Sequence, residues 1–278
     1  MSTENALLTI LVEKINNDTL VLPTLPAIAL KVRKAADDPE VNLNAMAEVI
    51  AQDASLSARM IKIANSAYLG RTVKVSSISQ AVTRIGLTQI KNISTALAME
   101  QLFVSRNELV KSYMKKVWSN TVDVVANALA ALEMYNKTKQ RHLSMDALTL
   151  GALVHNIGVL PILTEAERHE DVFANPTFLN VAIQKLAGTL SAKIMQEWEF
   201  EDVFAKTAEN WRDLNYSPDE VAYVDFVRLG AVLAGSFTSQ KDAVINICQK
   251  KGIIEDVNVL HSDEFIEMVN TAKQAFEN

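Results

Sequence analysis

The hydrophobic positions of this chain recur at helical spacing over nearly its whole length. In the first segment Leu7, Leu11 and Ile15 fall on one helix face, and the same spacing of three or four returns in later segments. The dipeptides Asn-Gly and Asp-Gly, which are typical of tight β-hairpins, do not occur. The pattern therefore predicts an all-α protein that contains no sheet of three or more strands.

Polar and helix-breaking residues divide the first half of this pattern into separate helices. The stretch "LPTLP" separates the first helix from a second one that has Pro26 in its first turn. Asp53 is suited to cap a later helix, and Ser76 or Ser77 is suited to cap the next. Gly86 should end that helix and make a tight corner before another begins.

The second half of the chain is predicted to be helical as well. One long helix should run from Glu108 to about Tyr135, and Ser144 should cap the next one. Further helices are expected near residues 178–186, 189–198, 201–211, 217–238 and 263–276. The polar residues near 105–108 suggest two helical lobes packed into one compact unit. The first lobe would comprise residues 1–107 and the second residues 108–278.

Composition and charge exclude several classes of function. The formal net charge of −6 argues against binding nucleic acid, which needs excess positive charge facing phosphate. The single cysteine, Cys248, fits a reducing compartment. No stretch approaches the roughly 20 continuous apolar residues of a membrane span, and the first residues lack the basic region of a secretory signal. We therefore expect a cytoplasmic protein that binds neither nucleic acid nor membrane.

The stretch Gly151–Leu163, "GALVHNIGVLPIL", contains the first candidate site. It is apolar except for the adjacent His155 and Asn156. With aspartate in the second place, this pair would offer a metal one imidazole and one carboxylate. The Asn156 amide has no negative charge and is a poor ligand for a hard or borderline cation.

Several ordered landmarks give the chain a family resemblance. Asp53–Gly70 reads "DASLSARMIKIANSAYLG" and Val75–Ile93 reads "VSSISQAVTRIGLTQIKNI". With "LPTLPAIALKV" upstream and "GALVHNIGVLPIL" downstream, they strongly resemble the HDOD family, a bacterial all-helical signalling domain related to HD-type phosphohydrolases. Ala54 is a small departure, because the family favours proline there. The resemblance implies a helical fold and a regulatory role in signalling or gene regulation.

The resemblance also implies where an HD-type metal centre would take its ligands. The central His-Asp pair matches His155 and Asn156, and the other ligand positions fall at Asn120, Ala187 and Asn210. Every expected ligand except His155 is missing, so we expect no metal, no cofactor and no catalytic residue. His155 should then be a neutral core histidine, hydrogen-bonded to Asn156 or Asn120. Replacing Asn156 by aspartate should create an unpaired carboxylate in an apolar helix end.

Other candidate residues are interpreted as structural. The run Glu165–Phe173, "EAERHEDVF", could be mistaken for a metal-binding cluster, but we interpret it as a solvated connector because adjacent charges are usually exposed. Cys248 is a weak candidate for a nucleophile. The three tryptophans should anchor packing between helices, and they are Trp118, Trp198 and Trp211.

A basic segment provides the second candidate site. Residues 54–99 contain no Asp or Glu, so this segment carries +6 while the rest of the chain carries −12. One reading is a face that docks an acidic partner or a phosphate-bearing ligand, and the other is an ordinary solvated surface. The candidate residues on the first reading are Arg59, Lys62, Asn65, Ser66, Arg71, Arg84 and Lys91.

Three functions are consistent with these observations. The favoured one is a non-catalytic cytoplasmic regulatory module that acts through contacts with a signalling protein in trans, since no receiver, cyclase or kinase signature is attached. The first alternative is a divalent-metal-dependent phosphohydrolase of the HD superfamily, and the missing ligands argue against it. The second alternative is a sensor that binds a nucleotide or another anionic small molecule in the vestigial cavity or on the basic face.

Overall fold

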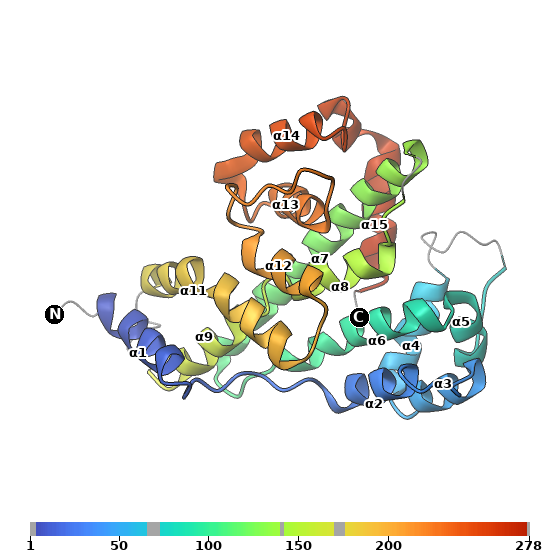
Figure 1. Ribbon diagram of the computed structural model, residues 1–278, viewed down its shortest axis with the longest axis horizontal. Helices are drawn as coiled ribbons and strands as arrows, with labels where there is room; N and C mark the ends of the chain where they lie inside the picture. The colour runs from blue at the N-terminus through green and yellow to red at the C-terminus, as the bar shows by residue number, and fades with distance from the viewer. Residues whose placement is uncertain (1–3, 66–72, 140–141, 170–175, 277–278) are drawn as a thin grey trace.

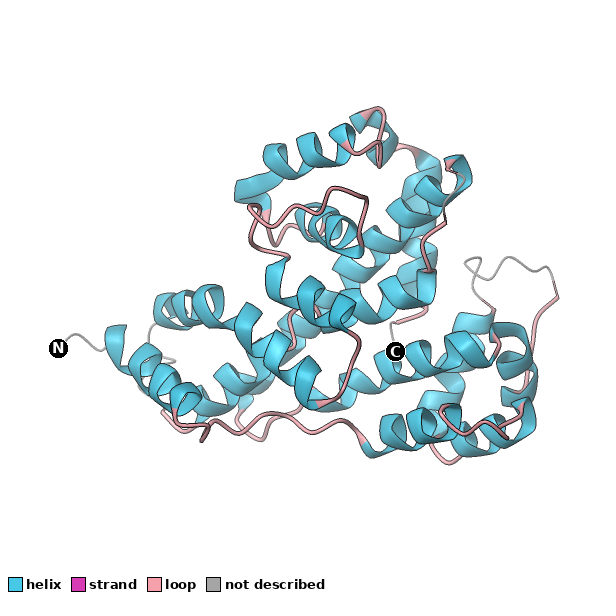
Figure 2. Cartoon of the chain, viewed as in Figure 1, coloured by secondary structure: helices cyan, strands magenta, loops and turns pink. Residues whose placement is uncertain are grey.

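The computed structural model describes residues 4–65, 73–139, 142–169 and 176–276, and every regular element within these ranges is a helix (Figure 2). For this part of the chain the prediction of an all-α fold without a sheet is confirmed. The helices form two groups that share one continuous hydrophobic core (Figure 1).

The first group contains five helices of the N-terminal half. They are α2 (Ala27–Ala36), α3 (Leu43–Ala51), α4 (Ala54–Ala64), α5 (Ile78–Ile85) and α6 (Leu87–Ala98). The predicted caps are present, because the Asp53 carboxylate accepts from Leu56 N–H at 2.8 Å and the Ser77 hydroxyl accepts from Gln80 N–H at 3.3 Å. Gly86 makes the corner between α5 and α6 with a φ of +88°, a conformation that favours glycine.

The second group surrounds the long helix α7 (Glu108–Thr138), which packs against α8, α13 and α15 (Figure 1). Asn107 caps α7, and Ser144 caps α8 as predicted. The other helices of this group are α8 (Met145–Val154), α9 (Val159–Glu167), α11 (Pro176–Glu197), α12 (Asp202–Asn210), α13 (Tyr223–Leu233), α14 (Lys241–Lys250) and α15 (Asp263–Gln274).

The first helix, α1 (Glu4–Asn16), lies beside α9 and α11, away from α2–α6 (Figure 1). Its Leu7 and Leu11 side chains are 1% and 0% exposed. The chain then crosses from α1 to α2 through a long non-helical connection that includes "LPTLP". The boundary expected near residue 107 coincides with the start of α7, but α1 packs against helices that follow that boundary.

Two expectations for the second half are wrong, and one helix is missing from the prediction. Residues 178–186 and 189–198 belong to one helix, α11, rather than two. Gly188 lies inside α11 and permits the close packing of α12. A Cβ at this position would lie 2.5 Å from the Glu209 carbonyl oxygen. The helix expected over 217–238 is confined to Tyr223–Leu233, and α14 was not predicted.

The solvated-connector interpretation is also wrong for residues 165–167, which are helical, whereas Arg168 and His169 follow α9 with exposed side chains, and residues 170–173 lie outside the described ranges. Glu165 is part of α9 and its side chain is 2% exposed. It pairs with Lys14 at 2.5 Å and Arg168 at 3.1 Å, and lies 3.4 Å from His169. Desolvation alone would raise the pKa of Glu165, but the Lys14 contact and its other partners hold that pKa below its ordinary value. These charges anchor α1 to α9.

One stretch, Met145–Glu167, is long and apolar enough to cross a membrane by length and composition. Within its apolar window, 83% of the residues are buried inside the protein. A core helix passes the same test, and this stretch contains α8 and α9, both of which pack within the second group.

Candidate functional site

The turn that carries His155 and Asn156 lies directly against α11. It follows α8 and leads into α9, and the Gly158 N–H donates to Ser191 Oγ at 2.9 Å. A Cβ at position 158 would lie 2.1 Å from the Ala187 carbonyl oxygen. Glycine is therefore required there, and the close approach brings the His155 turn to the part of α11 that contains Ala187.

The His155 side chain is fully enclosed. It is 1% exposed, and its Nδ1 lies 2.5 Å from the Ala152 carbonyl oxygen. Because a carbonyl oxygen only accepts, Nδ1 carries the proton. Burial, with a contribution from the Arg212 charge, lowers the pKa of His155 to about 3 although the Ala152 bond opposes the shift. The expected buried, hydrogen-bonded histidine is present, but its partner is a carbonyl of its own helix rather than an asparagine.

The Asn156 carboxamide is paired with a cation. Its Oδ1 accepts from Arg212 Nη2 at 3.1 Å, and the guanidinium stacks 3.9 Å above the centre of the Trp211 ring. Burial lowers the pKa of Arg212 to about 10, so the side chain remains charged at neutral pH. The expectation that aspartate at position 156 would be unpaired is therefore wrong. No local pattern indicated Arg212, because it lies 56 residues from Asn156 in the sequence.

The remaining ligand positions of an HD-type centre do not supply metal donors. The Asn120 amide donates to the Ala234 carbonyl at 3.4 Å, and the Asn210 amide donates to the Lys206 carbonyl at 2.9 Å. Ala187 has no donor atom in its side chain. Among the described residues, no group of three or more His, Cys, Asp or Glu could hold a metal ion.

These residues do not fit a divalent cation. The set contains one imidazole and four positions without a carboxylate, and a guanidinium lies next to the Asn156 amide. Divalent sites in proteins need several anionic or imidazole ligands converging from different elements. The positive charge of the Arg212 guanidinium beside Asn156 would repel a metal cation bound at this position.

Arg228 holds the segment that carries Trp211 and Arg212. This side chain is 1% exposed, and it donates to the carbonyl groups of four residues that follow or end α12. These acceptors are Trp211 at 3.1 Å, Asn210 at 2.9 Å, Tyr216 at 2.7 Å and Asp213. Sequence reasoning missed Arg228, since a charged residue in α13 gives no signal of burial.

Cys248 is not an activated nucleophile. Its side chain is fully buried, and burial followed by the nearby Asp225 charge raises the pKa of the thiol to about 12. The tryptophans pack between helices as expected, with Trp211 1% and Trp198 8% exposed. Trp118 is partly buried and its ring centre lies 5.2 Å from that of Phe103.

The enclosure of His155 predicts a specific dependence of stability on pH. Because its pKa is about 3 in the folded state and about 6.5 when unfolded, the folded form resists protonation. The contribution of neutral His155 to the unfolding free energy is therefore complete above pH 6.5 and is lost as the pH falls toward 3. Between pH 7 and pH 5 the wild type should lose about 2 kcal/mol more unfolding free energy than His155→Gln. Urea denaturation at both pH values measures this difference, and parallel curves would contradict it.

The basic segment does not form the expected docking face at Arg59. This side chain is 7% exposed and donates to the Leu97 carbonyl at 3.0 Å and the Phe276 carbonyl at 3.3 Å. It also pairs with Glu100 at 2.5 Å. Arg59 therefore connects α4 to the end of α6 and to the residues after α15, and its assignment to an exposed binding surface is wrong.

Most of the other basic candidates have structural contacts on different elements. Arg84 donates to the Ala64 carbonyl at 3.0 Å and to the Val73 carbonyl, while Lys91 pairs with Asp37 at 2.5 Å. The Asn65 amide exchanges two hydrogen bonds with the Val75 backbone, both 2.8 Å. Lys62 is exposed on α4. Ser66 and Arg71 lie outside the described residues. The described candidates are thus engaged mainly in structural contacts, which argues against a shared anion site on the basic segment.

Comparisons with known proteins place this architecture among solved structures. A protein of Shewanella amazonensis SB2B, provisionally named a metal-dependent phosphohydrolase, is 41% identical, with a TM-score of 0.95 and complete coverage of both chains. A protein of Marinobacter aquaeolei VT8, provisionally named a signal transduction protein, has a TM-score of 0.57 at 16% identity. That alignment covers 99% of this chain and 64% of the other, and at this identity it indicates a shared fold alone.

A curated relative and a family profile complete the comparison. An uncharacterized protein of Treponema pallidum (strain Nichols) is 24% identical over 210 residues, which is 72% of this chain. The chain spans 39% of the length of that relative. The HDOD domain profile matches residues 22–213, well over half of the chain and including the His155 turn and the basic segment. On this match, the protein belongs to the HDOD domain family.

Proposed function

We propose that this HDOD protein is a cytoplasmic regulatory module that acts by binding a signalling protein in trans and does not hydrolyse phosphate esters. The contact between Asn156 and Arg212 carries the proposal. An amide stands where an HD-type centre needs a carboxylate, and a guanidinium lies 3.1 Å from its oxygen. This site therefore lacks the anionic ligand of an HD-type metal centre, and the Arg212 cation occupies the position where it would compete with a metal ion.

The second candidate is a metal-dependent phosphohydrolase. The name of the Shewanella protein favours it, since that protein is 41% identical over the whole chain. In such enzymes a metal lowers the pKa of bound water and produces a nucleophile. Of the five HD-type positions here, only His155 has a ligand-type side chain, and no carboxylate accompanies it.

Elemental analysis and a hydrolysis screen distinguish the two candidates. The purified wild type should contain no stoichiometric divalent metal and should not hydrolyse phosphodiesters or nucleotides after incubation with Mn²⁺, Mg²⁺, Zn²⁺ or Fe²⁺. The Asn156→Asp variant should behave in the same way, because the new carboxylate would pair with Arg212. Its stability at neutral pH should be maintained for the same reason.

Two controls sharpen this test. The double variant Asn156→Asp with Arg212→Met removes the competing guanidinium, and it should also remain inactive because the positions at Asn120, Ala187 and Asn210 still lack suitable ligands. An active HD-type phosphohydrolase in the same plate verifies the assay. Tightly held metal with turnover in the wild type would overturn the proposal.

A further inference from the structure

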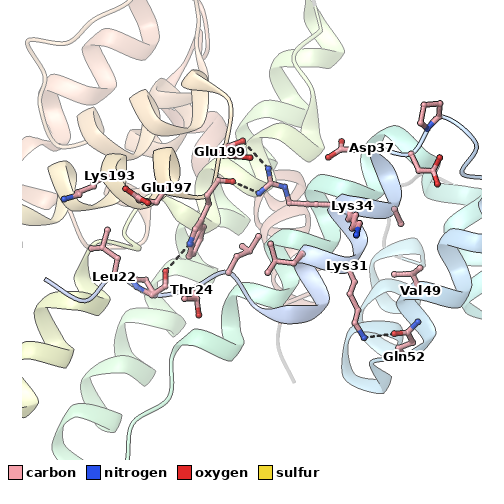
Figure 3. Close-up of a pocket in the computed structure, with 18 of the residues that line it drawn as sticks. Leu22, Thr24, Lys31, Lys34, Asp37, Val49, Gln52, Lys193, Glu197 and Glu199 are labelled. Carbon is pink, nitrogen blue, oxygen red and sulfur yellow. Dashed lines mark hydrogen bonds between the residues drawn. The ribbon is translucent and has the colours of Figure 1, made fainter. Parts of the chain in front are cut away.

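A large groove lies between the α1–α2 connection, α2 and the C-terminal end of α11 (Figure 3). Its volume is about 1310 Å³, which exceeds that of a typical small-molecule pocket of roughly 300–1,000 Å³. The groove is open to solvent, and its walls come from segments far apart in the sequence. A chain-like ligand suits this shape better than a compact one.

Hydrogen bonds hold the two walls of the groove together. Arg33 on α2 donates to the carbonyls of Trp198 at 2.6 Å and Glu199 at 3.1 Å, and its guanidinium lies 4.4 Å from the centre of the Phe200 ring. The Trp198 indole N–H donates to the Pro23 carbonyl at 3.1 Å. The groove is therefore preformed, which lowers the entropic cost of binding.

The α1–α2 connection contributes unpaired backbone to the groove. Pro23 and Pro26 fix their own φ near roughly −65° and bias the residues before them toward extended conformations. The N–H groups of Leu22 and Thr24, which both line the groove, donate to no acceptor within the described ranges. An extended peptide can pair its own backbone with such groups, as in recognition by strand addition.

Apolar side chains are exposed beside this backbone. Leu30 on α2 lines the groove and is 52% exposed, and Val21, next to Leu22, is 59% exposed. Leu22 and Val49 are partly buried and line the same groove. Apolar side chains of a bound peptide would find contact surface here.

Charged side chains of both signs line the groove, and several of them form no ion pair in the described part of the chain (Figure 3). Lys31 donates to the Gln52 amide at 2.8 Å and has no carboxylate partner, and Lys34 has no partner among the described residues. Asp37 beside them is paired with Lys91. Glu197 and Glu199, at the end of α11, are exposed and form no ion pair in the described part of the chain.

We propose that this groove binds an extended peptide segment of a partner protein through backbone pairing with Leu22 and Thr24. Acidic side chains of that segment lie at Lys31 and Lys34, and its apolar centre contacts Leu30. Basic side chains at its other end meet the exposed carboxylates that terminate α11. The inference rests on the proposed function, because it assigns the surface and the chemistry by which that regulatory module recognises a protein in trans.

Selection from a random peptide display library against the full chain tests this proposal. Enriched peptides should have an apolar centre, acidic residues on one side and basic residues on the other. In fluorescence anisotropy, Lys31→Glu with Lys34→Glu should weaken binding of a selected peptide by roughly tenfold or more. The matched control, Lys185→Glu with Lys250→Glu, changes two exposed lysines outside the groove whose side chains have no partner among the described residues, and it should bind as the wild type does.

Two further measurements identify the mode of binding. Exchanging the acidic residues of the peptide for lysine should restore affinity for the Lys31→Glu, Lys34→Glu variant. In hydrogen exchange, the amides of Leu22 and Thr24 should become protected in the complex. A failure of selection, equal binding by both charge variants, or no protection at these amides would overturn the inference.

Two other experimental outcomes would lead to different conclusions. Self-association in sedimentation experiments that disappears in Lys31→Glu with Lys34→Glu would assign the groove to a second copy of this chain and reject a peptide partner. Metal-dependent turnover by the wild type would refute the proposed function itself, whereas the peptide selection tests only the groove.

Discussion

Replacing Arg228 by methionine should lower the unfolding free energy by about 3–5 kcal/mol. Methionine preserves much of the apolar volume of the side chain but removes every donor. The carbonyl groups of Asn210, Trp211, Asp213 and Tyr216 would then lose their shared partner in an enclosed place. Denaturation in guanidinium chloride at neutral pH measures this loss through the midpoint and slope of the transition.

A surface arginine provides the control for this measurement. Arg106 forms no hydrogen bond or ion pair in the described part of the chain, so Arg106→Met should change stability by only about 0.5 kcal/mol or less. Hydrogen exchange should also show faster opening of residues 210–216 in Arg228→Met than in the wild type. Equal stability of the two variants would mean that the Arg228 contacts do not hold this segment.

Replacing Gly158 by alanine should cost about 3 kcal/mol, because the new methyl group would lie 2.1 Å from the Ala187 carbonyl oxygen and 2.6 Å from the Ser191 nitrogen. Both are backbone atoms of α11 and cannot turn aside as a side chain could, so α9 and α11 must move apart. The hydrogen bond from the Gly158 N–H to Ser191 Oγ would be lost with that movement. Thermal and chemical denaturation both report the effect.

Gly151, seven residues earlier, is a matched control. It lies within α8, and an added Cβ would make ordinary contacts of 3.8 Å with Phe204 and 3.9 Å with Thr207. Gly151→Ala should therefore leave stability unchanged or raise it by about 0.5–1 kcal/mol, since alanine is the better helix former. Similar losses in both variants would show that Gly158 has no special contact with α11.

The caps and helices that could be predicted depend on short-range chemistry. Asp53, Ser77 and Ser144 cap helices as expected because a capping side chain reaches a backbone N–H only two or three residues away. The two helices expected over 178–186 and 189–198 form the single helix α11, and Gly188 within it allows the close approach of Glu209. Such a contact between helices cannot be read from the sequence, because it depends on which segment lies opposite.

The candidate site was predictable in part. The loss of a carboxylate at Asn156 could be read directly from the residue type, and the family landmarks located the other ligand positions. The guanidinium of Arg212 next to Asn156 could not be predicted, because it depends on how the end of α12 packs against the turn after α8. That contact changes the interpretation of the site from a depleted metal centre to one that carries its own cation.

The sequence by itself determined the all-α class, the family and the absence of a His-Asp pair, because periodicity, caps and residue identity are local properties. Only the tertiary structure decided which charged residues are buried. Arg59 and Lys62 look equivalent in the sequence, yet Arg59 reaches the Phe276 carbonyl, 217 residues away, while Lys62 is exposed. A long charged side chain has no pattern of its own, and whether it faces solvent or a set of buried carbonyls depends on which helices meet around it.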